Sequence, residues 1–307
     1  MRMVLTLIVN PEKTSDAGKL LKRCIKTATD AIQSSQGLVT FTYYLADNEA
    51  VDLFFDTDSP DDSPLRYTLL VALSPETCDW YLQPVLGRRK RMLIADMDST
   101  MIEVECIDEL ADFAGLKDKV SAITEAAMRG ELDFAQALRE RVALLQGMDS
   151  TVLEQCYRER VTFTPGAFSL VQTMAAEKHL TALVSGGFTF FTDRVAEKLG
   201  FGFSRANVLE ISDGKLTGAA VPPICDATTK RATLVELAAT HAIDHAAVLA
   251  VGDGANDIPM IQEAGLGVAF HAKEKAREAA SFAVNHCDLT ALLYVQGYHS
   301  SSIVREA

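Results

Sequence analysis

The feature that most constrains the fold of this chain is a short apolar run, residues 92–95, that leads directly into Asp96 and Asp98. A continuous apolar run of this length is typical of a strand buried in a parallel sheet. Open α/β sheets bind ligands at the carboxyl ends of such strands, so we expect Asp96 to lie in a crevice. One carboxylate could attack an electrophile while the other moves protons. A polar strand exit followed by Ser99 or Thr100 as a helix cap is the alternative.

The composition indicates a globular protein. Of its 307 residues, 48% are hydrophobic and 23% are charged, and the length predicts roughly two domains. The net charge of −13 and the absence of a long basic run predict neither a nucleic-acid partner nor an anionic membrane surface. The apolar residues 3–9 are too few for a membrane span and precede no small-residue cleavage site. The six cysteines include no CxxC pair, and we expect a cytoplasmic protein.

Residues 1–85 predict a small α+β domain with one helix on an antiparallel sheet, whose exposed edges could support a homodimer. Strands are expected at residues 3–9, 38–44, 51–55 and 66–72, and a helix at residues 16–32. Asp56 and Asp58 also follow an apolar run, but turn residues come next, and we expect a solvated acidic loop. The basic residues 84–91 predict a solvated hinge rather than a binding patch.

Residues 101–165 predict a helical insertion after the first strand of the parallel sheet, in the position of a lid. Phe134 and Arg141 are seven residues apart, which is close to two helical turns, so they project from the same face. Arg141 could bind a carboxylate and Glu105 an ammonium group. A surface ion pair on these charged helices is the alternative.

A second buried strand, residues 180–184, ends in Ser185, Gly186 and Gly187. Glycines let a ligand approach the backbone closely, and the following helix offers free N–H groups to an anion. Ser185 would then donate to a phosphate, although a helix cap explains it equally well. Lys230 lies in the first turn of a later helix, where positive charge is unfavourable unless a negative ligand lies near.

A third apolar strand, residues 246–251, is followed by Asp253 and Asp257, and residues 207–218 predict a small hairpin that lies before it. In a doubly wound sheet the three strand exits meet along one edge. They would bring together four carboxylates, a lysine and a hydroxyl group. Like charges this close raise one another's pKa or require a cation, and Mg²⁺ prefers such oxygen ligands. The cluster therefore predicts phosphoryl transfer to a carboxylate.

These motifs resemble, in order and spacing, those of the haloacid dehalogenase superfamily. They are Asp96-Met97-Asp98-Ser99-Thr100, Ser185-Gly186-Gly187, Lys230 and Gly252-Asp253-Gly254-Ala255-Asn256-Asp257. Within that superfamily, residues 98–109 and 265–273 are similar to the phosphoserine phosphatase family. The resemblance covers residues 91–295.

The resemblance implies an α/β fold, a doubly wound, Rossmann-like parallel sheet with a helical cap inserted after the first strand. Together with the pattern of the first 85 residues, it predicts an N-terminal α+β domain at residues 1–85, a phosphatase core at 86–295 with its cap at about 101–165, and a tail at 296–307. Phosphoserine phosphatases often carry an ACT-like region at the amino terminus. Here the pattern predicts one helix where the complete ACT pattern has two.

The resemblance also implies a role for each candidate site residue. Asp96 would be the nucleophile that forms an aspartyl phosphate, and Asp98 the general acid and then the base. Mg²⁺ would be bound by Asp96, the Asp98 backbone carbonyl and Asp253, with Asp257 and Gly187 in support. Phosphate would contact Ser185, Gly186, Lys230 and Asn256, and the amino-acid end of the substrate would contact Glu105 (ammonium), Arg141 (carboxylate), Met128 and Phe134 (apolar walls).

The activity that follows is Mg²⁺-dependent hydrolysis of O-phospho-L-serine, a small-molecule substrate, to L-serine and phosphate, the last step of serine biosynthesis. One alternative is a related phosphatase for another small phosphomonoester or a phosphoprotein, but Arg141 and Glu105 favour a free amino acid. The other is a non-catalytic phosphate- or amino-acid-binding module, which the intact Asp96 and Asp98 disfavour.

Overall fold

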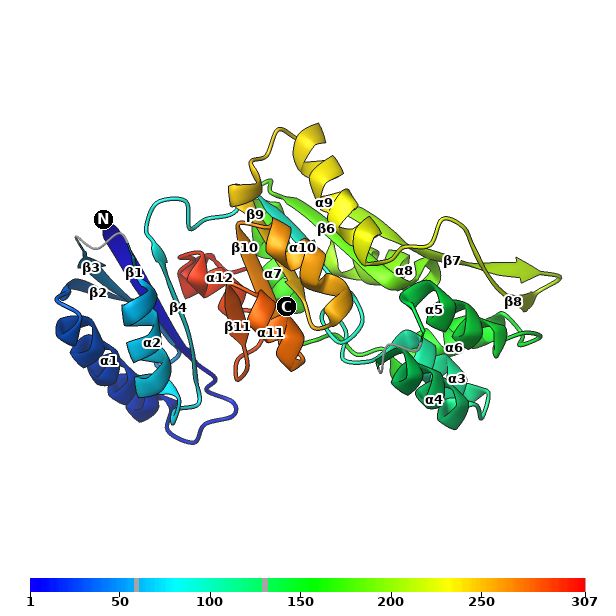
Figure 1. Ribbon diagram of the computed structural model, residues 1–307, viewed down its shortest axis with the longest axis horizontal. Coiled ribbons are helices and arrows are strands. Elements are labelled where there is room, and N and C mark those ends of the chain that lie inside the picture. The colour runs from blue at the N-terminus through cyan, green and yellow to red at the C-terminus, as the bar shows by residue number, and fades with distance from the viewer. Residues whose placement is uncertain (58–60, 129–131, 307) are drawn as a thin grey trace.

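The computed structural model describes residues 1–57, 61–128 and 132–306, which form two β-sheets. The four-stranded sheet has the order β2-β3-β1-β4, and the seven-stranded sheet has the order β11-β10-β9-β5-β6-β7-β8. The molecule is elongated, with the four-stranded sheet at one end, the larger sheet in the middle and a group of helices at the other end (Figure 1). Among the described residues, no helix has both the length and the hydrophobicity that crossing a membrane requires.

The N-terminal unit has the β-α-β-β-α-β order of a ferredoxin-like domain. Its elements are β1 (Arg2–Val9), α1 (Ala17–Ser34), β2 (Leu38–Ala46), β3 (Ala50–Asp56), α2 (Ser63–Leu73) and β4 (Cys78–Pro84). All neighbouring strands are antiparallel. Leucines of both helices share one core with Leu5 and Leu7 of β1, so both helices cover the same face of the sheet.

The strand that we predict at residues 66–72 is wrong, because this segment belongs to helix α2. The buried residues Leu65, Leu69 and Leu73 are spaced by four, which is the helical period, and Pro64 lies in the first turn, where proline is favoured. Within residues 66–72, Leu70 and Val71 are apolar as well as Leu69, and these neighbours hide the helical period. The unit therefore has two helices rather than one, and strand β4 completes its sheet.

The larger sheet confirms the predicted doubly wound architecture. Its strands are β5 (Met92–Ala95), β6 (Leu180–Phe188), β7 (Phe203–Ser212), β8 (Lys215–Val221), β9 (Val248–Gly252), β10 (Leu266–Phe270) and β11 (Phe282–Val284). All pairs are parallel except the β7–β8 hairpin. Strand β5 lies between β6 and β9, where the chain reverses its direction of travel across the sheet. Such a switch point is where open α/β sheets bind ligands.

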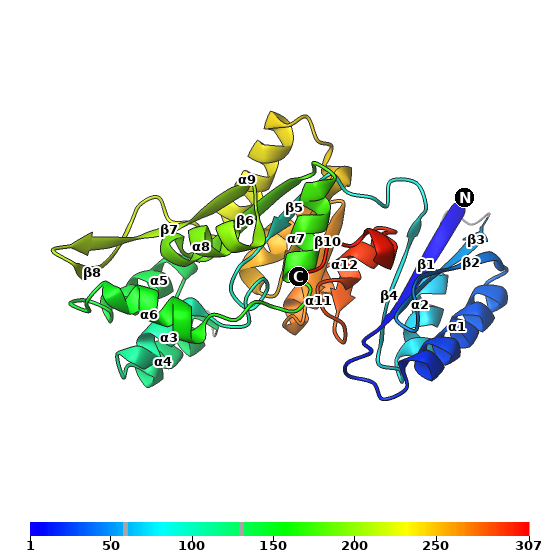
Figure 2. The same cartoon turned by 180° about the vertical axis from the view of Figure 1, so that it is seen from behind.

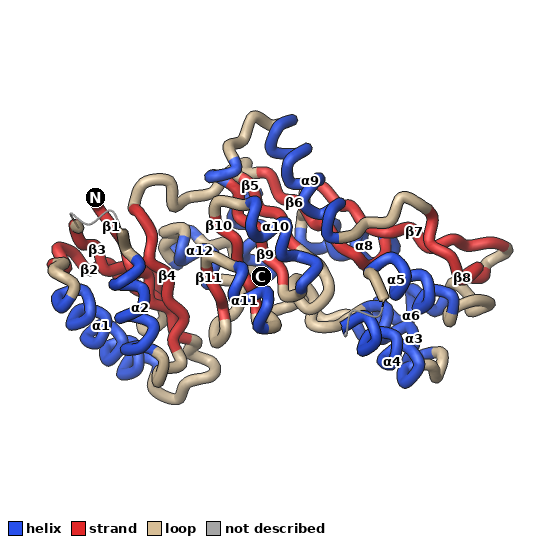
Figure 3. Tube along the Cα trace, in the orientation of Figure 1, coloured by secondary structure: helices blue, strands red, loops and turns tan. Residues whose placement is uncertain are grey.

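Helices cover both faces of this sheet (Figures 2 and 3). On one face lie α7 (Ala167–Ala176) and α8 (Thr189–Leu199), and on the other lie α9 (Ala227–Thr240), α10 (Ile258–Glu263) and α11 (Glu274–Ala279). Alternate residues of β5 enter the two cores: Leu93 packs with the α7 side and Ile94 with the α9 side. Because both faces are buried, the strand is apolar throughout. Helix α12 (Ala291–Val295) joins the core to the N-terminal sheet.

The predicted cap is confirmed, and its described residues form four helices between β5 and α7. They are α3 (Cys106–Phe113), α4 (Lys117–Met128), α5 (Phe134–Ala143) and α6 (Thr151–Arg160). Two hinge segments connect the cap to the core, and they pair through Glu103 N to Thr162 O (3.0 Å) and Thr164 N to Met101 O (3.1 Å). The predicted hairpin, β7–β8, lies against α5. The backbone of Leu216 in this hairpin forms hydrogen bonds with the loop that follows α5. The cap is thus held at two places.

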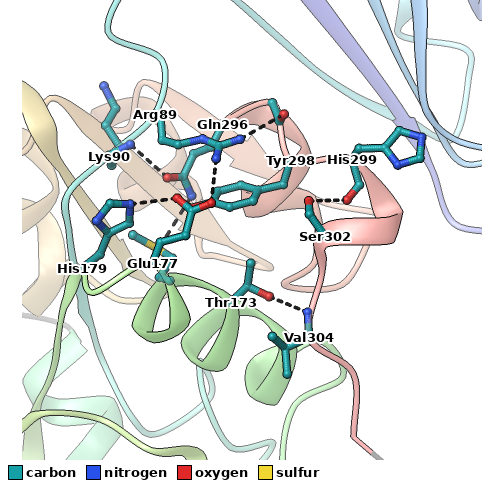
Figure 4. Close-up of polar contacts among 12 residues, drawn as sticks. Arg89, Lys90, Thr173, Glu177, His179, Gln296, Tyr298, His299, Ser302 and Val304 are labelled. Atoms are coloured by element: carbon teal, nitrogen blue, oxygen red, sulfur yellow. Dashed lines mark hydrogen bonds and ion pairs between the residues drawn. The ribbon is translucent and has the colours of Figure 1, made fainter.

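The solvated hinge that we predict at residues 84–91 is wrong, because its cations are bound on both sides. Arg88 lies 2.7 Å from the buried Asp52 carboxylate of β3 and also donates to the Tyr294 carbonyl of α12. Arg89 pairs with Glu177 at 2.9 Å and stacks 3.6 Å above the Tyr298 ring (Figure 4). The acidic partners are distant in sequence, so composition alone suggests an unpaired basic segment. This segment fastens the N-terminal unit to the core.

Candidate active site

The strand exits meet around a buried lysine. Asp96 follows β5 directly, and Lys230 lies in the first turn of α9, whose N-cap Asp226 accepts from the Thr229 N–H (2.8 Å). Lys230 is wholly buried, and its Nζ lies 2.7 Å from Asp96 Oδ1 and 2.7 Å from Asp257 Oδ1. These two carboxylates offset the cost of a cation at a helix N-terminus.

Asp96, Asp253 and Asp257 form an acidic cluster whose ligand oxygens all lie within 4.8 Å of one another. Burial, reinforced by the charge of Asp257, raises the pKa of Asp96 well above its usual range and that of Asp253 to about 6. Burial acts to lower the pKa of Lys230, but the charges of Asp257 and Asp96 outweigh it, so the pKa is raised and the ammonium group stays charged. The carboxylates therefore repel one another more than a single lysine relieves.

This cluster fits a hard divalent cation. The donors are all oxygen atoms, and a cation would relieve the repulsion that helps to raise the pKa values of Asp96 and Asp253. Asp257 lies within the cluster rather than merely beside it, and it also accepts from the Gly254 N–H at 3.0 Å. The Asp98 side chain lies outside the cluster. The prediction that Asp98 binds the metal through its backbone carbonyl is therefore the form of that role that stays open.

Asp98 faces the exit of β6. Its Oδ1 accepts from the Cys106 N–H (3.0 Å), and its Oδ2 accepts from the buried Ser185 hydroxyl (3.3 Å). Burial raises the pKa of Asp98, although the Cys106 N–H opposes this. A Cβ at Gly187 would lie 2.6 Å from Asp98 Oδ2, so only glycine fits at this position. An aspartate with a raised pKa is better suited to acid catalysis than an ordinary carboxylate.

The cap touches the glycines at the β6 exit through Phe134. A Cβ at Gly186 would lie 2.8 Å from Phe134 Cζ, so the aromatic ring lies directly against Gly186. Phe134 is the first residue of α5, which a capping box between Asp133 and Gln136 starts at this point. Phe134, which is predicted to form an apolar wall, thus lies over Gly186, which is predicted to contact phosphate.

Glu105 lies at the N-terminus of α3, and Ser99 Oγ donates to its Oε1 at 2.8 Å. The chain reaches this position because Ser99 adopts a left-handed backbone conformation, with φ of 53°. Although part of the Glu105 side chain stays accessible, the loss of solvent around its carboxyl, followed by the charge of Asp98, raises its pKa to about 7. A carboxylate of this kind would gain from a cationic partner.

Arg141 lies in the last turn of α5, and its Nε donates to the Ala137 carbonyl (3.2 Å). Within the described chain its guanidinium group forms no ion pair, so its planar donors stay available to an anion. Asp108 is a neighbour that the sequence reasoning did not select. Its Oδ1 is buried without a hydrogen-bond partner in the described chain, and the charge of Arg141 opposes the burial that raises its pKa. The signal was its position one turn after Glu105.

Two predicted residues are less well defined. Asn256 lies in the short 3₁₀ helix η2 (Ala255–Asp257) after β9 and is half-buried. Met128 ends α4, and its side chain lies outside the described part of the chain. Their contacts with a substrate stay predictions.

Comparisons with known proteins agree with this geometry. The family of haloacid dehalogenase-like hydrolases matches residues 93–262. The phosphoserine phosphatase of Albidiferax ferrireducens is 51% identical over 208 residues, which is 66% of this chain and 88% of that protein. The crystal structure of a HAD family hydrolase from Salmonella enterica serovar Typhi superposes with a TM-score of 0.83 at 29% identity, covering 96% of this chain and 99% of that one.

A phospho-aspartyl intermediate analogue of phosphoserine phosphatase has also been solved. It superposes with a TM-score of 0.63 at 38% identity and covers 67% of this chain and 98% of that one. The family match includes both Asp96 and Lys230. The chain belongs to the phosphoserine phosphatase family of haloacid dehalogenase-like hydrolases.

Proposed function

We propose that this enzyme hydrolyses O-phospho-L-serine to L-serine and phosphate through an aspartyl phosphate on Asp96. The observation that carries the proposal is the Asp96 carboxylate at the exit of the central strand, held 2.7 Å from Lys230 beneath a cap that offers Arg141 and Glu105. Relatives named phosphoserine phosphatase, at 40–51% identity, support it. They disfavour a non-catalytic binding module and a phosphatase with another substrate.

In the first half of the reaction, Asp96 attacks the phosphorus atom. Its Oδ1 accepts from the Met97 N–H and pairs with Lys230, each at 2.7 Å, so Oδ2 is the oxygen left free to attack. The bond from Oδ2 to phosphorus forms while the bond from phosphorus to the serine oxygen breaks. Asp98 gives its proton to the departing serine oxygen, and its raised pKa favours this role.

In the second half, a water molecule attacks the phosphorus of the aspartyl phosphate. Asp98, now a carboxylate, takes the proton of the attacking water, and the bond from phosphorus to Asp96 Oδ2 breaks. Inorganic phosphate leaves and Asp96 is regenerated. Splitting one difficult hydrolysis into two displacements is the usual gain from a covalent intermediate.

We propose that the metal ion is Mg²⁺, bound by Asp96, Asp253 and the Asp98 backbone carbonyl, with Asp257 and Gly187 in support. The all-oxygen cluster supports a hard cation of this kind. When bound, the ion supplies positive charge against the oxygens of the transferring phosphoryl group. Lys230 contributes a second, permanent positive charge from the protein itself.

The cap would recognise the amino-acid end of the substrate. We propose that Glu105 binds the ammonium group and Arg141 binds the carboxylate, with Phe134 and Met128 as apolar walls. On the core side, the phosphate would contact Ser185, Gly186, Lys230 and Asn256. Arg141, whose guanidinium forms no ion pair within the described chain, and the raised pKa of Glu105 support this orientation, because each group can still gain an opposite charge from the substrate.

Arg141→Ala tests the substrate. We expect kcat/KM for phosphoserine to fall roughly 10- to 100-fold, since charged hydrogen bonds contribute about 1.5–3 kcal/mol each. Hydrolysis of an aryl phosphate, which has no carboxylate, should change by less than about threefold. The measurement is phosphate release from both substrates. Arg139→Ala is the matched control, because Arg139 is exposed on the same helix.

Two results would contradict this proposal in different ways. If the wild-type enzyme releases phosphate from the aryl ester but not from phosphoserine, the substrate is wrong. If Arg141→Ala weakens both reactions equally, the substrate stands but the role of Arg141 does not.

Glu105 predicts a pH dependence. With a pKa of about 7, its carboxyl is mostly protonated below that pH and cannot pair with an ammonium group. We therefore expect KM for phosphoserine to rise about tenfold as the pH falls from 8 to 6, following the ionised fraction of one group. KM measured across this range should become nearly flat in Glu105→Gln. The aryl phosphate, which carries no ammonium group, serves as the control for ionisation of the phosphate itself. If KM for phosphoserine depends on pH in Glu105→Gln as it does in the wild type, the role assigned to Glu105 is refuted.

We also propose a homodimer through the outer edge of β2. Strand β2 pairs only with β3, carries no charged residue, and leaves Phe41 and Tyr44 53% and 46% exposed. Uncharged edge strands of this kind invite pairing with another chain. Light scattering at micromolar concentration should give twice the mass of the 33.3 kDa chain, and Phe41→Lys should reduce it. A wild-type monomer would exclude the dimer.

We propose a cytoplasmic location. All six cysteines are buried and unpaired, which suits a reducing compartment. The net charge of −13 likewise favours a small-molecule substrate over a nucleic acid.

A further inference from the structure

We propose that Asn207, the fifth residue of β7, is a positioning residue that fixes the direction of the Ser185 hydroxyl group. The inference rests on the proposed function, because Ser185 matters only if phosphate binds beside it. The Asn207 side chain is wholly buried. Its Nδ2 donates to the Gly186 carbonyl at 2.8 Å, and its Oδ1 accepts from the Cys225 N–H at 2.7 Å. One side chain thus joins two segments that the proposed mechanism uses.

The first segment is the peptide unit between Gly186 and Gly187. Because a trans peptide is planar, its C=O and N–H point in opposite directions, and holding one fixes the other. Asn207 holds the Gly186 carbonyl, and the Gly187 N–H on the far side donates to Ser185 Oγ at 2.8 Å. Without that anchor, two adjacent glycines leave this unit free to rotate.

The direction of the Ser185 proton follows from this bond. One acceptor position of Oγ is occupied by the Gly187 N–H, so the hydroxyl hydrogen points away from Gly187. In the structure it is donated to Asp98 Oδ2 at 3.3 Å, the side on which the phosphoryl group would lie. Asn207 therefore makes Ser185 a donor toward the reacting groups, although Asn207 does not touch them.

The second segment leads into α9. Cys225 is the residue before Asp226, the N-cap of α9. Asn207 accepts from the Cys225 N–H and also donates to the Cys225 carbonyl at 3.4 Å. Lys230 follows within the first turn of that helix. A single amide group is therefore shared between the segments that carry the hydroxyl donor and the lysine. Misplacing catalytic groups by about 1 Å can reduce rates by roughly 100-fold.

The experiment compares Asn207→Ala with Gln172→Ala. Gln172 also donates its amide to a backbone carbonyl, that of Leu199 at 2.7 Å, but it lies on α7 away from the site. At equal folded fraction we expect Asn207→Ala to lower kcat by about 10- to 100-fold, for phosphoserine and the aryl phosphate alike. Gln172→Ala should stay within about threefold. If Asn207→Ala does not fold, Asn207→Asp retains the shape and the acceptor but lacks the donor to Gly186, and the same loss is expected.

A double-mutant cycle with Ser185→Ala separates positioning from general destabilisation. If Asn207 acts through Ser185, the double variant should lose at least about threefold less than the product of the two single losses. Multiplying losses would overturn the proposal, and so would an Asn207→Ala enzyme as active as Gln172→Ala, or a loss confined to phosphoserine. Failure of the wild-type enzyme on phosphoserine would refute the substrate instead, and the cycle could still be read with the aryl phosphate.

Discussion

Asp96→Asn is expected to abolish turnover, with kcat lowered by about 10⁴-fold or more, as for the removal of other covalent nucleophiles. An amide oxygen does not form an acyl phosphate, although it can still accept from the Met97 N–H and from Lys230. The variant should fold, because the pKa of the Asp96 carboxyl is raised, which means that its surroundings already disfavour the charge that the substitution removes. Phosphate release and trapping with beryllium fluoride, detected by mass, are the measurements.

The matched control for this variant is Asp56→Asn. Asp56 also ends an apolar strand and also begins an Asp-x-Asp pair, but it lies exposed at the end of β3. It should retain full activity. Chelation by EDTA should silence the wild-type enzyme, and Mg²⁺ should restore it. Residual activity above about one percent in Asp96→Asn, or a phosphoryl adduct on another residue, would contradict the mechanism.

The architecture of the larger sheet could be predicted because its strands are buried on both faces. Strands β5, β9 and β10 are therefore continuous apolar runs, which a sequence displays without any knowledge of neighbours. Parallel strands share one carboxyl edge, so the polar residues after them had to lie together. This argument predicts that Asp96, Asp253 and Asp257 lie together, as the structure shows.

The N-terminal unit was harder to predict because its signals are local and short. Helix α2 presents Leu65, Leu69 and Leu73 to the core, yet Leu70 and Val71 between them are also apolar and exposed, so the helical period is masked. The prediction of a solvated hinge at residues 84–91 was wrong for a different reason. Whether Arg88 is solvated depends on Asp52, and only the fold brings these two residues together.

The sequence motifs select neither Asn207 nor Asp108. Asn207 looks like an ordinary residue in the first strand of a hairpin, and Asp108 looks like one of several acids on a helix. Their importance depends on burial and on a partner far away in the chain, Gly186 for Asn207 and Arg141 for Asp108. Motifs reveal residues that touch the reacting atoms, whereas the groups that hold them emerge from the packing.

The second large effect is expected for Lys230→Met, which retains the length of the side chain and removes its charge. Asp96 and Asp257 would each lose a 2.7 Å partner inside the protein. Breaking a buried ion pair from one side typically costs about 3–5 kcal/mol of stability. Removing a preorganised positive charge beside the phosphoryl group should lower kcat/KM by about 10²- to 10³-fold on both substrates.

The sign of the accompanying pH effect distinguishes this variant from a simple cavity. In the wild type, the pKa of Lys230 is raised in the folded state, so its charge contributes stability at any pH below its ordinary pKa. That stability is lost only as the pH rises through the higher folded pKa. Lys230 therefore adds no pH dependence near neutrality. In Lys230→Met, Asp96 would lose the cation that opposes the rise of its pKa, so its protonated form would be favoured further. The melting temperature of the metal-free variant should therefore fall further below that of the wild type at pH 8 than at pH 5.5.

Arg231→Met is the control for Lys230→Met, since Arg231 is the next residue of α9 and pairs with Glu263 at the surface. An exposed pair contributes about 0–1 kcal/mol, so this variant should stay close to the wild type at both pH values. Mg²⁺ should recover part of the lost stability of Lys230→Met, because a cation in the acidic cluster replaces some of the missing charge. If Lys230→Met instead shows an equal loss at both pH values and no response to Mg²⁺, Lys230 fills space rather than balancing the carboxylates, and the electrostatic basis of the site would have to be abandoned.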